Sequence, residues 1–153
     1  LGELKNVMLV RKNLQHRLNI DPNNTILAGV SRGGWLVSDL LDMRPAAWAA
    51  AVITCAGHHG ILQNVKPSFA GKYIYIGAGE KDPNLEAAKR AAIYFESRGA
   101  EVVFDIYKDL GHNVDPNSPT IKNGSPKCTR NYKAIPNSSI YSIYNGMAVN
   151  ILK

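Results

Sequence analysis

Residues Thr25 to Leu41 read TILAGVSRGGWLVSDLL, and this stretch decides the fold. The apolar run 26–28 predicts a buried strand, and the apolar periodicity after the paired glycines predicts a helix. Ser31 stands between the two, at a turn so sharp that only small neighbours such as Gly29 and Gly33 let it close. The turn pushes the Ser31 hydroxyl toward the helix start, where free backbone N–H groups and the positive helix end favour a developing oxyanion.

Outward from this stretch, strands alternate with helices. Helices are expected at residues 2–18, 32–43 and 84–98, and strands at about 25–28, 48–55, 72–77 and 102–107. Such alternation predicts a parallel sheet with helices on both faces. The expected fold class is therefore α/β, a three-layer sandwich with a mainly parallel sheet of about four strands from Ser31's own strand onward, and the 153 residues are expected to form one domain.

The sequence changes character after Asn113. Prolines and polar residues over 113–137 predict a long Pro-rich loop, of a length that is usually functional or mobile. The apolar residues of the last segment share one helical face: Ile140, Ile143, Tyr144, Met147, Ala148 and Ile151. That spacing predicts a C-terminal helix over 138–152.

Two later motifs stand at the ends of expected strands, as Ser31 does. Asp82 follows the third strand, and His112 follows Gly111 after the fourth. Together with the motif GVSRG at 29–33, this order of Ser, Asp and His resembles the α/β-hydrolase superfamily, in particular its esterase, depolymerase-like and prolyl-oligopeptidase-like serine hydrolases. The resemblance covers residues 1–112, which correspond to the C-terminal half of such a domain.

The resemblance implies a serine hydrolase that cleaves a carboxylic ester, in preference to an amide, through an acyl-enzyme on Ser31. His112 would be the general base, and Asp82 would orient it and stabilise its charged form. Glu80 is the alternative acid, although the family's common G-x-x-D spelling favours Asp82. The backbone N–H of Arg32 would donate to the oxyanion.

His58 and His59 lie in the loop that borders the substrate pocket in this family, so the resemblance implies that they contact substrate. Adjacent histidines on one loop rarely converge on one ion, and no acidic cluster lies near them in the sequence. We therefore expect neither a metal nor a cofactor. The expected ligand is a small-molecule or polymeric ester.

A complete domain of this family carries about four strands before the serine turn, whereas this chain begins one helix upstream of it. We therefore expect a partial domain without the loop that normally supplies the second oxyanion donor. The alternative function is a non-catalytic hydrolase-like module, or a fragment that needs a partner half for activity. The strand edge at Thr25–Ala28 would be apolar and unpaired, so it is expected to pair with the absent half, with a second copy in a homodimer, or with the chain's own tail.

The formal charge of +6 is spread over several segments. No basic patch interleaved with aromatic residues stands out, so we expect no nucleic-acid partner, and a binding module for anions has only the net charge in its favour. No apolar run is long enough to span a membrane, and no membrane partner is expected.

The two cysteines, Cys55 and Cys128, form no metal-binding pattern. Cys55 follows an apolar run and is expected to be a buried free thiol. In an exported protein a Cys55–Cys128 disulfide is the alternative. The sequence leaves the compartment open, with a lean toward secreted or periplasmic proteins.

Overall fold

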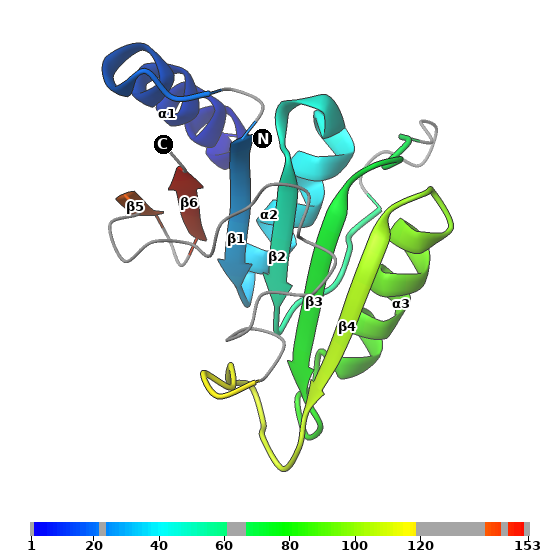
Figure 1. The fold of residues 1–153 in the computed structure, drawn as a ribbon. Coiled ribbons are helices and arrows are strands. Elements are labelled where there is room, and N and C mark those ends of the chain that lie inside the picture. The colour runs from blue at the N-terminus through cyan, green and yellow to red at the C-terminus, as the bar shows by residue number, and fades with distance from the viewer. Residues whose placement is uncertain (1, 22–23, 61–66, 119–139, 145–146, 152–153) are drawn as a thin grey trace.

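The computed structural model describes residues 2–21, 24–60 and 67–118, together with the backbone of 140–144 and 147–151 (Figure 1). The described strands form one six-stranded sheet in the order β4-β3-β2-β1-β6-β5. Four strands are parallel to one another: β1 (Thr25–Val30), β2 (Ala50–Thr54), β3 (Tyr73–Gly79) and β4 (Glu101–Tyr107). The helices are α1 (Gly2–Leu18), α2 (Arg32–Met43) and α3 (Leu85–Glu96), with a short 3-10 turn η2 (Pro45–Ala47). These elements confirm the predicted α/β class and its parallel strands.

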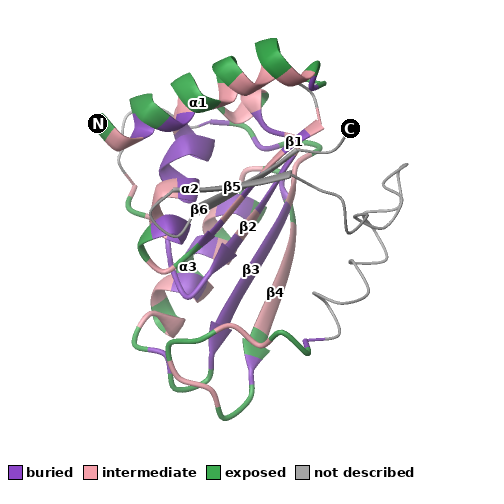
Figure 2. Ribbon diagram, turned by 90° about the vertical axis from the view of Figure 1, so that its left-hand side faces the viewer, coloured by how far each residue is buried: buried purple, intermediate pink, exposed green. Residues whose placement is uncertain are grey.

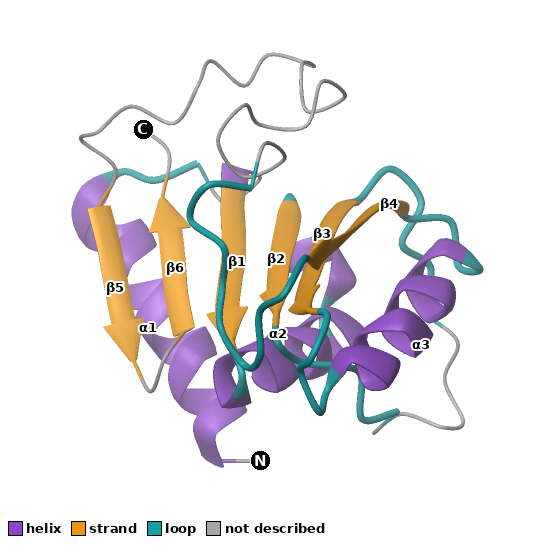
Figure 3. Cartoon of the chain, turned by 90° about the horizontal axis from the view of Figure 1, so that it is seen from below, coloured by secondary structure: helices purple, strands orange, loops and turns teal. Residues whose placement is uncertain are grey.

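One face of the sheet carries all three described helices (Figures 2 and 3). Leu27, Ala51 and Ile74 lie in one row across β1, β2 and β3 and are all buried in the core. Apolar residues of α2 and α3 join the same core: Val37, Leu40, Leu41, Ala88, Ala91 and Phe95. The helices predicted for the opposite face are not found in the part of the chain that the structure describes. Among the described helices, none is both long and apolar enough to cross a bilayer.

The predicted C-terminal helix over 138–152 is wrong at the positions the structure describes. The chain forms two antiparallel strands there, β5 (Ile140–Tyr144) and β6 (Met147–Ile151). Isoleucine, tyrosine and valine are strand-forming residues, and the intervening dipeptide Asn145-Gly146 is typical of two-residue hairpin loops. Sequence reasoning weighed the helical spacing and missed that dipeptide. Of the predicted loop 113–137, the residues after Ser118 lie outside the described part.

The edge of β1 that was predicted to need a partner is covered by β6. The two strands run antiparallel, with Leu27 opposite Val149 and Ala28 opposite Ala148. Of the three partners predicted for this edge, the structure therefore shows the chain's own tail. This pairing supplies backbone hydrogen-bond partners to an apolar strand. The stabilisation from that tertiary contact outweighs the helix preference that the spacing of apolar residues in the tail indicates.

Candidate active site

Ser31 occupies the turn between β1 and α2, and its backbone is strained. Its φ is 53° and its ψ is −122°, in a region that residues with a side chain rarely adopt. The Ser31 N–H donates to the Thr54 carbonyl at 2.8 Å, which anchors the turn to the end of β2. A Cβ on Gly29 would lie 2.3 Å from the Gly33 carbonyl oxygen, so only glycine fits there. The sharp turn predicted from the sequence is present.

A chain of two hydrogen bonds joins the three side chains that the sequence singled out. Ser31 Oγ lies 2.7 Å from His112 Nε2, and His112 Nδ1 lies 3.0 Å from Asp82 Oδ1. An ionised carboxylate can only accept, so Nδ1 carries the proton and Nε2 accepts from the Ser31 hydroxyl. The residues come from the ends of three parallel strands, which meet at one edge of the sheet. The sequence places them 51 and 30 positions apart, and the fold brings them together.

Asp82 supplies the carboxylate of this series of hydrogen bonds, and that carboxylate is kept ionised. Burial alone would raise its pKa, but hydrogen bonds from His112 and from the backbone N–H of Asn84, at 2.8 Å, outweigh that and hold the pKa below its ordinary value. Glu80, the alternative acid, is exposed, and its Oε2 accepts the backbone N–H of Asp109 at 3.1 Å. The geometry therefore favours Asp82 over Glu80.

The start of α2 supplies backbone donors beside Ser31. Arg32 is the first residue of the helix, and the N–H groups of a first helical turn have no intrahelical acceptor. The Arg32 N–H therefore lies at the positive end of the helix, next to the Ser31 hydroxyl. The Arg32 side chain points outward and forms an exposed ion pair with Glu3 of α1.

A cavity of about 420 Å³ opens beside Ser31. Its lining residues come from α1, the serine turn, α2 and the loop after β2: Glu3, Ser31, Arg32, Trp35, Leu36, Asp39 and His59. The His59 ring stacks on Trp35 with a centroid separation of 4.4 Å, and its Nδ1 lies 3.1 Å from Asp39. The structure thus brings His59, which the sequence predicted to contact substrate, into the cavity that contains Ser31.

His58 faces the core instead. Its side chain is 8% exposed, its Nε2 lies 2.6 Å from Asp42, and its ring stacks on Tyr94 with centroids 3.7 Å apart. Tyr94 donates its hydroxyl to the same carboxylate at 2.8 Å. The structure therefore does not place His58 among the residues that line the cavity.

Sequence reasoning missed Asp39 and Asp42, the carboxylates that hold the two histidines. Both are buried on α2, where they flank Leu40 and Leu41. Two acids one helical turn apart on the apolar face of a helix are a signal, because buried carboxylates need partners. The adjacent histidines of the next loop are the partners that this signal could have identified.

Replacing Asp42 with alanine is expected to destabilise the protein by about 3 kcal/mol, because the change leaves His58 and the Tyr94 hydroxyl buried without their acceptor. Urea denaturation followed by circular dichroism measures the loss. Glu86→Ala is the matched control, since Glu86 pairs with Lys89 on an exposed helix surface and its loss should leave the urea midpoint close to that of wild type. Equal midpoints for the two variants would show that the His58 network contributes nothing.

Asp39 gives a pH-dependent prediction. Burial raises its pKa from the ordinary 3.8, and the hydrogen bond with His59 opposes that rise only in part. A folded pKa above the unfolded one means that folding opposes ionisation, so this carboxyl favours the native state below about pH 4 and loses that contribution as pH rises through the folded pKa. The amide of Asp39→Asn does not ionise. The variant's stability relative to wild type should therefore increase across this range, as read from urea midpoints at several pH values, and a constant difference would contradict the prediction.

No known protein-family model matches the chain. The esterase YpfH of Escherichia coli (strain K12) is 29% identical over 106 residues, which are 68% of this chain and 44% of that protein. The chain therefore spans less than half of this curated relative.

Solved structures resemble the chain at lower identity. The Bacillus cereus carboxylesterase has a TM-score of 0.64 at 22% identity and covers 74% of this chain, which spans 53% of it. The carboxylesterase of Mesorhizobium loti has a TM-score of 0.64 at 22% identity, and the match covers 74% of this chain and 54% of the carboxylesterase. Arabidopsis thaliana SOBER1 has a TM-score of 0.60 at 20% identity, and the match covers 73% of this chain and 55% of SOBER1. The fold is thus that of the α/β-hydrolases, as the sequence motifs predicted, over about half of each solved chain.

Proposed function

We propose that this chain, which has the α/β-hydrolase fold, cleaves carboxylic esters through an acyl-enzyme on Ser31. The observation that carries the proposal is the continuous hydrogen-bond chain from Ser31 Oγ through His112 to Asp82, at 2.7 and 3.0 Å. The strained turn that presents Ser31 supports the same assignment, because such strain gathers at functional positions. The Escherichia coli relative is named an esterase, and the Bacillus cereus and Mesorhizobium loti proteins are named carboxylesterases, which supports an ester as the substrate class.

In the acylation half, His112 Nε2 takes the Ser31 proton while Oγ forms a bond to the ester carbonyl carbon. The carbonyl electrons move to its oxygen, and the N–H of Arg32 donates to the oxyanion. When the carbonyl re-forms, the alkoxide leaves with the proton from His112. The alcohol departs and the acyl group stays on Ser31.

In the deacylation half, a water replaces the alcohol and the same transfers run again. His112 takes a proton from the water, the hydroxide adds to the acyl carbon, and the carboxylic acid leaves as Ser31 recovers its proton from His112. Asp82 remains ionised throughout, since its pKa lies below the ordinary value, and it stabilises the imidazolium that forms twice per cycle.

The rate of this cycle depends on how many donors reach the oxyanion. Loss of one such donor costs about two to three orders of magnitude in other serine hydrolases. With one donor, the Arg32 N–H at the start of α2, we expect slow ester turnover, while Ser31 still reacts with an activated phosphonate. The alternative is a non-catalytic module that keeps the serine turn only as architecture.

A fluorophosphonate probe and p-nitrophenyl acetate test the proposal. We expect wild type to carry one phosphonyl adduct, on Ser31 by mass spectrometry, and Ser31→Ala to carry none and to lose hydrolysis. Ser97→Ala is the control, because Ser97 is an exposed serine at the end of α3 whose hydroxyl donates to the Tyr94 carbonyl. Folded wild-type protein that takes up no probe would overturn the proposal in favour of the non-catalytic module.

A further inference from the structure

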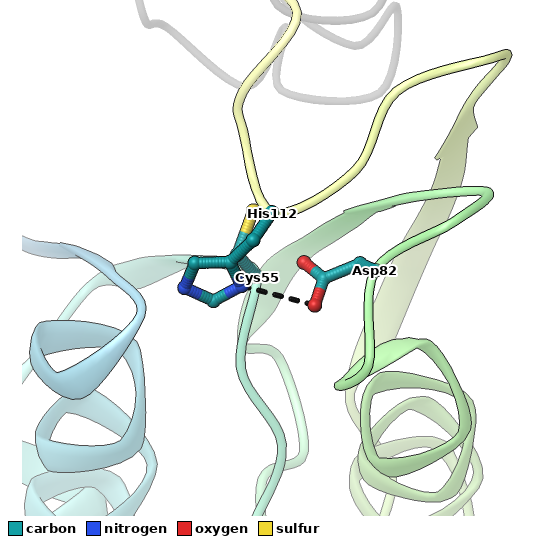
Figure 4. Close-up of side chains that lie close together, drawn as sticks. All are labelled: Cys55, Asp82 and His112. Carbon is teal, nitrogen blue, oxygen red and sulfur yellow. Dashed lines mark hydrogen bonds and ion pairs between the residues drawn. The ribbon is translucent and has the colours of Figure 1, made fainter.

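Three potential metal ligands lie close together after the ends of β2, β3 and β4 (Figure 4). They are Cys55, directly after β2, and Asp82 and His112, which follow β3 and β4. One ligand atom of each, the thiol sulfur, a carboxylate oxygen and a ring nitrogen, lies within 4.8 Å of the other two. The residues are far apart in the sequence, so no short spacing motif predicts this group of ligands.

Two features of this group are unused by the proposed reaction. Asp82 Oδ2 is buried with no hydrogen-bond partner among the described residues, on a side chain that is 0% exposed, although a buried carboxylate oxygen normally accepts from a donor. Cys55 is 0% exposed, and its backbone holds a φ of 53°, which is strained for a residue with a side chain. Its thiol donates to the Asn113 carbonyl at 3.3 Å and lies beside the Asp82 carboxylate.

We propose that Cys55, Asp82 and His112 form a binding site for Zn²⁺. A thiolate, an imidazole and a carboxylate are the ligands that zinc takes in proteins, and three of them leave a fourth position open. Zinc bonds of about 2.0 to 2.3 Å bring ligand atoms to about 3.5 Å from one another. The ligand atoms that are farthest apart must therefore approach each other by about 1 Å when zinc binds. The ion enters past His112, because the His112 side chain is 39% exposed.

Zinc and the proposed esterase reaction compete for the same ring. Binding through His112 Nδ1 displaces the hydrogen bond to Asp82, and the ring proton moves to Nε2. Nε2 then cannot accept the Ser31 proton, so the serine is no longer activated. The thiol proton of Cys55 is released to solvent as the Zn–S bond forms. This inhibition, though not the binding itself, rests on the proposed function.

Binding is tested with Cd²⁺, whose bond to a thiolate gives a charge-transfer absorption in the ultraviolet. We expect the band in wild type and in Cys128→Ser, and its loss in Cys55→Gly, a change that also suits the positive φ of that position. Circular dichroism shows whether Cys55→Gly folds. A band of equal strength in Cys55→Gly and wild type would overturn the site, whatever the activity of the chain.

A second variant keeps the test decisive if Cys55→Gly does not fold. His112→Gln retains the thiol and changes a side chain that is partly exposed, and we expect its Cd²⁺ affinity to fall at least tenfold. Unchanged affinity would exclude His112 as a ligand and overturn the proposal. Inhibition is read separately: Zn²⁺ should slow fluorophosphonate labelling of wild type at least tenfold, with reversal by EDTA, and labelling that ignores bound Zn²⁺ would refute the competition for His112.

Discussion

Replacing His112 with alanine is expected to slow fluorophosphonate labelling of Ser31 by at least about a thousandfold. The reason is the 2.7 Å contact between His112 Nε2 and Ser31 Oγ, because a serine hydroxyl without a base is a weak nucleophile. Labelling isolates the activation of Ser31 from deacylation, so the measurement holds even where ester turnover is slow. Intact-protein mass spectrometry at several times gives the rate.

Asp82→Asn separates the role of the ring from the role of its carboxylate partner. The asparagine keeps the shape but allows the wrong ring tautomer, so we expect a large loss, smaller than that of His112→Ala. His16→Ala is the matched histidine control, since His16 is exposed on α1. If His112→Ala labelled as fast as His16→Ala, Ser31 would be reacting without a base and the proposed mechanism would fail.

The sequence predicted the framework of this site because its signals are local. A serine between glycines, an acid after one strand and a glycine-histidine pair after another each describe a strand end, and parallel strands bring such ends to one edge. The structure places Ser31, Asp82 and His112 at that edge within hydrogen-bond distance. The bounds of the helices and parallel strands also follow local periodicity and agree with the structure within a few residues.

The features that the sequence did not predict depend on contacts between distant segments. Asp42 lies 16 positions from His58, and only the packing of α2 against the loop after β2 shows that they pair. Strand β6 forms against β1, and β5 forms against β6. The periodicity of the tail alone does not show that β1 is available as a partner. That α2 and α3 lie on one face follows from the crossovers from β1 to β2 and from β3 to β4, which run in the same direction across the sheet and which composition does not record.

Gly79→Ala is expected to lower kcat/KM for p-nitrophenyl acetate by about a hundredfold, through the position of His112 rather than its chemistry. A Cβ on Gly79 would lie 2.0 Å from the Gly111 carbonyl oxygen and 2.4 Å from that of Leu110. Both are backbone atoms, so the loop after β4 must move away from the end of β3. The hydrogen bond from the Lys81 N–H to the Leu110 carbonyl, 2.8 Å long, lengthens with it.

Gly111→Ala makes the comparison specific to that contact. It adds the same methyl group one residue before His112, yet its Cβ would meet nothing within 4 Å. We therefore expect Gly111→Ala to keep kcat/KM within a fewfold of wild type, while Gly79→Ala loses it and unfolds at lower urea concentration. Equal kcat/KM for the two variants would mean that the turns after β3 and β4 adjust independently, and that the 3.0 Å contact between Asp82 and His112 does not depend on the close approach of their backbones.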